Sequence, residues 1–140
     1  MSEQCSVCET RMHAISIRET TLTGQRAIVT GANSGIGEAI ARGLAEAGAT
    51  VVINYVANDE RARQVVSEIA ADGGTAIALK ADVSDEAQVR AMFRHAVEAF
   101  GSVDILVNNA GLQQDAPFHE MTLAQWRKVI DINLTGQFLC

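Results

Sequence analysis

The chain has 140 residues, of which 48% are hydrophobic and 20% charged, a composition typical of one globular domain. It carries 17 acidic and 11 basic side chains, a formal charge of −6, and no basic stripe, so neither nucleic acid nor an anionic membrane surface is an expected partner. The sequence shows no apolar run of the ~20 residues that a membrane span needs and no signal-peptide pattern, so we expect a cytoplasmic protein with reduced thiols.

Residues 1–23 show no sustained periodicity, and we interpret them as a flexible N-terminal tail. The tail contains Cys5-x-x-Cys8, followed by His13. A zinc site needs further ligands at comparable spacing, and a redox pair usually stands at the start of a helix after a strand. The sequence offers neither context, so we expect no metal site here.

From residue 24 to residue 140, apolar segments with strand and helix periods alternate, which predicts one folded domain. Short β-branched runs predict strands at 26–30, 50–55, 75–80 and 104–108. Helical spacing predicts helices at 35–47, 58–72 and 84–99, and a long helix from Thr122 onward. Ser84 is the expected N-cap of the third helix, and Thr122-x-x-Gln125 matches a capping box. This order predicts an α/β fold with a doubly wound parallel sheet, because connections between parallel strands are right-handed.

The expected core-facing positions of the helices are apolar residues at helical spacing. They are Ile36, Ile40, Leu44 and Ala47; Val65, Val66 and Ile69; Val89, Met92, Phe93, Val97 and Phe100; and Val129, Ile130 and Leu134. We expect Trp126 in the core or in a subunit interface, Cys140 on a core-facing helix position, and His95 and His119 on the surface.

The first predicted strand ends in a glycine loop, Thr30-Gly31-Ala32-Asn33-Ser34-Gly35-Ile36-Gly37, directly before a helix. Glycine there lets the backbone approach a pyrophosphate, and a Cβ at the last position would push the helix off the strand. The helix N-terminus offers unpaired N–H groups and a partial positive charge. A glycine triplet alone also fits a turn that binds nothing, but its place between strand and helix favours an anion site.

The T-G-A-N-S-G-I-G segment resembles the cofactor loop of the classical short-chain dehydrogenase/reductase family. Further family blocks follow in order: Asp82-Val83 after the third strand, Asn108-Asn109-Ala110-Gly111 after the fourth, and Asn133 within the long helix. The resemblance covers about residues 22–140 and looks most like the glucose 1-dehydrogenase and 3-oxoacyl-carrier-protein reductase branches. It implies a Rossmann-like sheet with strand order 3-2-1-4. It also implies an NAD(P)-dependent oxidoreductase that transfers a hydride between a nicotinamide and an alcohol or carbonyl substrate.

The resemblance also implies roles for individual residues. In the loop, Gly31, Gly35 and Gly37 would shape the seat of the pyrophosphate, and Asn33, Ser34 and Ile36 would line it. Asn109, Ala110 and Gly111 would pass beneath the second ribose, whereas Asn108 would steady the central strands.

Two further assignments keep an alternative. Asp82, with Val83, would contact the adenine ring, although Asp82 also fits a residue that starts the next helix. Asn133 would hold, through its backbone carbonyl, a water that relays protons to a catalytic lysine. A buried amide with a local partner is the alternative for Asn133.

Asn54 and Tyr55 stand at the end of the second strand, where the family places an acidic residue that selects NAD. The missing carboxylate removes the repulsion of a 2′-phosphate, yet no lysine or arginine stands immediately beside it. Arg61 and Arg63 fit the solvated face of a helix. We predict that both nucleotides are used, with a preference for NADP.

The family's chemistry needs a serine and a Tyr-x-x-x-Lys motif, and the sequence contains neither in the expected place. Tyr55 is the single tyrosine, Ser102 is the last serine, and no tyrosine stands four residues before Lys80 or Lys128. We therefore expect an incomplete domain, truncated after the fourth strand and following helix, that has no turnover by itself and leaves the fourth strand as an exposed edge. A complete protein would be a homo-oligomer with a small-molecule substrate. The alternative is a non-catalytic NAD(P)-binding module or an interaction partner of a full-length relative.

Overall fold

The computed structural model describes residues 21–140. Cys5, Cys8 and His13 lie outside the described residues. Leu22 packs against the apolar core, and its backbone N–H donates to the carbonyl of Ala47 at 2.9 Å. The packed part therefore includes Leu22, which the sequence assigned to the tail.

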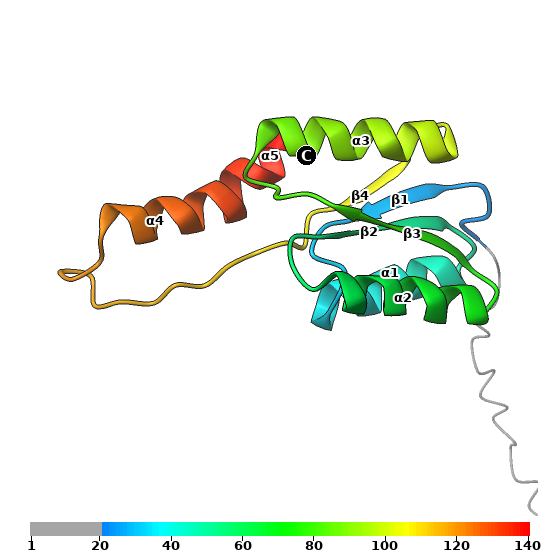
Figure 1. Cartoon of the computed structure of the whole chain (residues 1–140), viewed down its shortest axis with the longest axis horizontal. Helices are drawn as coiled ribbons and strands as arrows, with labels where there is room; N and C mark the ends of the chain where they lie inside the picture. Colours follow the sequence, from blue (N-terminus) through cyan, green and yellow to red (C-terminus); the bar gives the residue numbers. More distant parts are fainter. Residues whose placement is uncertain (1–20) are drawn as a thin grey trace, which may run out of the picture.

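Four parallel strands form one sheet (Figure 1). They are β1 (Arg26–Val29), β2 (Thr50–Tyr55), β3 (Thr75–Lys80) and β4 (Ile105–Val107). Their order, β3-β2-β1-β4, confirms the predicted topology. β4 lies at one edge of the sheet beside β1, and Leu106 in it is exposed. β1 and β4 are shorter than predicted.

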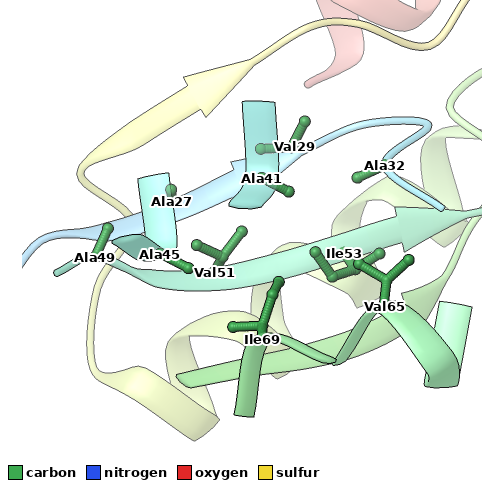
Figure 2. Close-up of a cluster of buried hydrophobic side chains, with 10 residues drawn as sticks. All are labelled: Ala27, Val29, Ala32, Ala41, Ala45, Ala49, Val51, Ile53, Val65 and Ile69. Atoms are coloured by element: carbon green, nitrogen blue, oxygen red, sulfur yellow. The ribbon is translucent and has the colours of Figure 1, made fainter. Parts of the chain in front are cut away.

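Helices cover both faces of the sheet. α1 (Gly35–Glu46) and α2 (Asp59–Ala71) lie on one face, and α3 (Glu86–Phe100) lies on the other (Figure 1). Two apolar clusters fill the spaces between these layers. The cluster under α1 and α2 is the larger one and contains Ala27, Val29, Ala32, Ala41, Ala45, Ala49, Val51, Ile53, Val65 and Ile69 (Figure 2). The cluster under α3 contains Ile28, Val52, Ala81, Met92 and Ala96.

Small residues face the sheet at positions where the sequence predicted larger ones. Ile36 is 75% exposed and Val97 is 45% exposed, so both predictions were wrong. Gly37, Ala41 and Ala45 make the buried side of α1. Small side chains let a helix approach the sheet closely, and this close packing favours Gly37 and Ala41 over Ile36 in α1 and Ala96 over Val97 in α3.

The N-cap of α3 is Asp85, not Ser84. The Asp85 side chain accepts a hydrogen bond from the backbone N–H of Gln88 at 3.0 Å. Ser84 instead donates its hydroxyl to Asp82 at 2.6 Å. Because the Ser84 hydroxyl is held by Asp82, the next carboxylate in the chain caps the helix.

The last helical stretch is interrupted rather than continuous. It consists of α4 (Leu123–Ile130), a π-helical segment η1 (Asp131–Thr135) and α5 (Gly136–Leu139). The predicted capping box of Thr122 and Gln125 is present. α4 has no buried residue and projects from the sheet (Figure 1), with Trp126 52% exposed and Leu134 of η1 64% exposed. The prediction that Leu134 faces the core was therefore wrong, and Trp126 does not lie in the core of this chain.

Among residues 21–140, no helix combines the length and the apolar character that a membrane crossing requires.

Candidate functional site

The sequence blocks singled out above meet at the carboxyl ends of the strands, because parallel strands all end at the same edge of a sheet. A pocket of about 370 Å³ lies at this edge. It is lined by residues from β2, from the connections after β2, β3 and β4, and from α4 and η1: Asn54, Val56, Ala81, Asp82, Val83, Ala110, Gly111, Leu112, Lys128 and Ile132.

The N-terminus of α1 lacks a side-chain cap. Its N-cap residue, Ser34, has an extended backbone and makes no capping hydrogen bond. The N-caps of α2, α3 and α4 are Asn58, Asp85 and Thr122, and each accepts a hydrogen bond from its own helix. The first backbone N–H groups of an α-helix have no partner within the helix. In α1 they therefore remain open to an acceptor from outside.

The three glycines of the loop serve different purposes. Gly35 has a φ of +58°, and a Cβ there would meet open space. A Cβ on Gly37 would lie well inside 3.0 Å of the Gly31 carbonyl oxygen and of the Asn109 side chain. A Cβ on Gly31 would lie 3.0 Å from the Cα of Ala110. Gly31 and Gly37 thus permit close packing within the protein, whereas Gly35 leaves free space outside it.

Thr30 and Asn109 join the ends of β1 and β4. The Thr30 hydroxyl accepts hydrogen bonds from the backbone N–H groups of Asn109 (2.9 Å) and Ala110 (3.0 Å). The Asn109 side chain donates to the carbonyls of Thr30 (2.9 Å) and Gly31 (3.2 Å). Asn108 is exposed, so the steadying role that the sequence gave to Asn108 falls to its neighbour Asn109. Thr30 was missed as a site residue, although a polar residue at the end of an apolar strand was a signal for it.

Asn54 and Tyr55 are both buried, with 1% and 7% of their surfaces exposed. The Asn54 side chain accepts from the Gly31 backbone N–H at 3.2 Å and donates to the Ala81 carbonyl at 3.0 Å. Asn54 therefore ties the glycine loop to the end of β3. Tyr55 is absent from the pocket lining. The exposed residue that follows them, Val56, lines the pocket instead.

Asp82 lines the pocket and also starts the connection to α3. Its Oδ1 accepts hydrogen bonds from the backbone N–H (2.9 Å) and the hydroxyl (2.6 Å) of Ser84. Val83 is buried beside it. Asp82 therefore does not start α3, whose N-cap is Asp85; it forms a turn with Ser84 before that helix and also lines the pocket.

Two close contacts hold the last helical stretch against the pocket. Asn133, half-buried in η1, accepts from the Leu112 backbone N–H at 2.7 Å and donates to the Leu112 carbonyl at 2.9 Å. Gly136 is buried in α5, and a Cβ there would lie 2.8 Å from a methyl carbon of Val83. The alternative for Asn133, an amide with a local partner, is thus observed. The sequence analysis did not single out Gly136.

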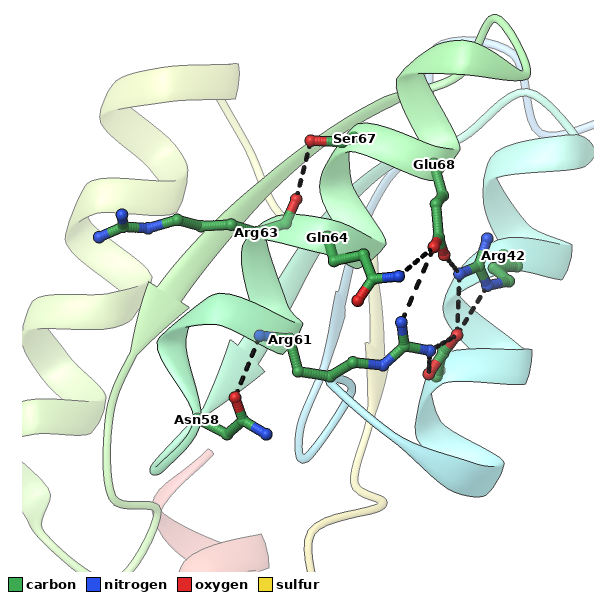
Figure 3. A network of polar contacts seen from close by, with 8 residues as sticks. Arg42, Asn58, Arg61, Arg63, Gln64, Ser67 and Glu68 are labelled. Atoms are coloured by element: carbon green, nitrogen blue, oxygen red, sulfur yellow. Dashed lines mark hydrogen bonds and ion pairs between the residues drawn. The ribbon is translucent and has the colours of Figure 1, made fainter.

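Arg61 belongs to an ionic network between α1 and α2 (Figure 3). Its guanidinium donates to both carboxylate oxygens of Glu38 at 2.6 Å. Arg42 joins Glu38 to Glu68, and its hydrogen bond to Glu68 lowers the pKa of that carboxyl. Arg63 extends away from this network (Figure 3). Arg63 is solvated as predicted, but the same prediction was wrong for Arg61.

Within the part of the chain that the structure describes, no group of three or more histidine, cysteine, aspartate or glutamate side chains is arranged to hold a metal ion.

A family model described as short chain dehydrogenase matches residues 25–140. The chain belongs to this oxidoreductase family. Among curated relatives, the 3-oxoacyl-(acyl-carrier-protein) reductase of Synechocystis sp. is 47% identical over 121 residues, which cover 86% of this chain and 49% of the relative. The reductase of the same name from Staphylococcus aureus is 47% identical over 114 residues, which cover 81% of this chain and 46% of the relative. The chain thus spans about half the length of these relatives.

Solved structures give the same match. A dehydrogenase/reductase from Sinorhizobium meliloti 1021 superposes with a TM-score of 0.84 at 44% identity, covering 88% of this chain and 49% of that one. A short-chain dehydrogenase from Burkholderia cenocepacia J2315, solved in complex with NADP, has a TM-score of 0.82 at 43% identity, covering 85% of this chain and 49% of that one. At these identities the family's nucleotide-binding Rossmann fold extends to this chain.

Proposed function

We propose that these residues form the nucleotide-binding portion of an NAD(P)-dependent oxidoreductase that acts on an alcohol or carbonyl substrate. The observation that carries the proposal is the N-terminus of α1, whose first N–H groups lack a side-chain cap while Gly35 leaves free space before them. Such a helix N-terminus attracts anions. Pyrophosphate is the anion that fits a glycine loop between a strand and a helix, beside a pocket that can take the rest of a dinucleotide.

The residues at this edge of the sheet suit the parts of a dinucleotide. Asn33, Ser34, Gly35 and Ile36 would surround the pyrophosphate, and Asp82 with Val83 would border the adenine ring. Ala110 and Gly111 would lie beneath the second ribose, where small residues permit close approach. When bound, the nicotinamide supplies the hydride, and the protein supplies orientation and a proton.

We propose that both NADP and NAD bind, with a preference for NADP. No carboxylate stands among residues 54–58 at the end of β2, and the next one, Asp59, is paired with Lys80 at 3.6 Å, so repulsion of a 2′-phosphate is weak there. The NADP complex of the Burkholderia relative supports this preference. Nucleotide dissociation constants with a hundredfold preference for NAD would contradict it.

Binding without turnover is the expected behaviour of these 140 residues alone. They contain no Tyr-x-x-x-Lys motif, so a group that exchanges a proton with the substrate is missing. The Asn133 backbone carbonyl would hold a relay water only with that motif in place. Clear cofactor-dependent turnover by the purified chain would refute this expectation, and it would show that other residues carry the proton.

The test of the proposed function is a titration of the purified chain with NADPH and with NADH, followed by nicotinamide fluorescence. Saturable binding is expected. Ser34→Asp adds a good N-cap and a negative charge at the N-terminus of α1, so it should preserve stability and weaken binding by about tenfold or more. Ser34→Ala is the matched control: it removes the hydroxyl without adding a charge or a cap, so it should weaken binding much less than Ser34→Asp and leave the helix unchanged, because Ser34 makes no capping bond. Normal binding by Ser34→Asp would exclude this N-terminus as the pyrophosphate seat, and a non-catalytic role with another ligand would then be favoured.

A further inference from the structure

Lys128 is the one cationic side chain among the residues that line the pocket. It lies in the last turn of α4 and is exposed. It makes no ion pair with a carboxylate in the part of the chain that the structure describes. Val56, from the connection after β2, lines the same pocket. The Lys128 ammonium is therefore a free positive charge at the site proposed for the adenosine end of the nucleotide.

Arg61 of α2 and Lys80 of β3, the two elements that follow β2 in the chain, are cations that are both engaged in ion pairs. Arg61 is held by the two carboxylate oxygens of Glu38 at 2.6 Å. The ammonium of Lys80, at the end of β3, lies 3.6 Å from Asp59. Ion pairing leaves little net positive charge at either position, so neither can attract a ligand anion as Lys128 can.

We infer that Lys128 is a specificity-determining residue that favours the dinucleotide carrying a 2′-phosphate on its adenosine ribose. This inference rests on the proposed function. NADP and NAD differ in this one group, which carries a charge of about −1.5 to −2 near neutral pH. The pocket already contains the carboxylate of Asp82, which would oppose that charge. A free ammonium on the same pocket compensates for Asp82, and its field reaches about 8 Å at physiological ionic strength.

The experiment compares Lys128→Gln with Arg127→Gln in the purified protein. Arg127 is the neighbouring cation in the same turn of α4; it is exposed and does not line the pocket. Arg127→Gln therefore removes the same charge from the same helix end without changing the pocket lining. The dissociation constants of NADPH and NADH are measured for each variant. For Lys128→Gln we expect the dissociation constant of NADPH to rise about fivefold and that of NADH to change by less than about twofold. For Lys128→Glu we expect a larger loss of NADPH affinity. Arg127→Gln should leave the ratio of the two constants unchanged.

Salt provides a second measurement. Raising the ionic strength screens the Lys128 ammonium and should lower the NADPH preference of the wild-type protein. It should not lower that of Lys128→Gln, which has no ammonium at this position. Equal weakening of both nucleotides in Lys128→Gln, or the same change of ratio in Arg127→Gln, would overturn the assignment of specificity to Lys128. Binding of both nucleotides with an unchanged ratio in Lys128→Gln would overturn this inference alone, whereas failure of the wild-type protein to bind either nucleotide would overturn the proposed function.

Discussion

Gly37 is the position where a single methyl group should do most damage to the site. In Gly37→Ala the new Cβ lies well inside 3.0 Å of the Gly31 carbonyl oxygen, and ordinary contact begins at 3.4 Å. To bring the Cβ from inside 3.0 Å out to a 3.4 Å contact, the loop backbone must move away from α1 by at least 0.4 Å. Overpacking of this kind costs about 1–3 kcal/mol, and alanine's better helix propensity offsets at most about 1 kcal/mol of it. With about 1 kcal/mol subtracted from that range, we expect a net loss of up to about 2 kcal/mol in unfolding free energy.

Gly43→Ala is the matched control on the same helix. A Cβ on Gly43 meets nothing within 4 Å, so this change should stabilise the protein by about 0.5–1 kcal/mol through helix propensity alone. Urea unfolding at constant m-value measures both changes, and nicotinamide fluorescence measures the binding of NADPH. Gly37→Ala should bind NADPH more weakly, since the loop has moved, while Gly43→Ala should bind it normally. Equal stability and equal binding of the two variants would refute the argument that the third loop glycine is required by packing.

Three further changes test the hydrogen bonds around the site. Asn54→Asp places a carboxylate in a position that is 1% exposed, and it should lower the unfolding free energy by about 3 kcal/mol in urea titrations; an unchanged midpoint would show that the amide is dispensable. Asn133→Ala leaves both backbone groups of Leu112 without their partner and should cost about 1–3 kcal/mol, measured in the same way, whereas a change below about 0.5 kcal/mol would contradict the observed pairing. The backbone N–H of Gln88 holds the pKa of Asp85 below its ordinary value of 3.8, so this cap stabilises the fold above that pH and loses its contribution as the pH falls below it. Asp85→Asn, an equally good cap, should match the wild type at neutral pH and show a shallower loss of stability in acid; identical acid unfolding curves would exclude Asp85 as a contributor.

The sheet order and the place of the site could be predicted because their signals are local. β-Branched runs and terminating glycines mark each strand and helix without knowledge of the rest of the fold. Right-handed connections leave few topologies open, and the resemblance to the dinucleotide-binding family gave the strand order among them. The blocks at Gly31, Asp82 and Asn109 each follow a strand, so a parallel sheet necessarily brings them to one edge.

The choice between neighbouring residues could not be predicted, because it depends on contacts across the fold. Ser84 and Asp85 are both good N-caps, and the structure uses Asp85 because Asp82 already holds the Ser84 hydroxyl. Val97 and Ala96 both fit a helical stripe. The close approach of α3 to the sheet decides between them in favour of the smaller residue.

At the end of β2, the sequence did not show that the polar side chains of Asn54 and Tyr55 are buried. The sequence placed Asn54 and Tyr55 where a nucleotide would be recognised, since strand ends usually present their side chains to a ligand. The structure instead uses the Asn54 amide as an internal link between Gly31 and Ala81. A buried amide must satisfy its donors and acceptor, and the neighbouring loop supplied partners that no sequence pattern announces.

Gly136 shows why the wall of the pocket depends on residues that look unfavourable in isolation. A glycine inside a helix costs about 1 kcal/mol relative to alanine, so helix propensity alone argues against it. Here it lets α5 contact Val83, while Asn133, three residues earlier, holds the backbone of Leu112. Val83 and Leu112 both line the pocket. The same helical stretch therefore positions two walls of the site, and the local cost of Gly136 is offset by the packing that places them.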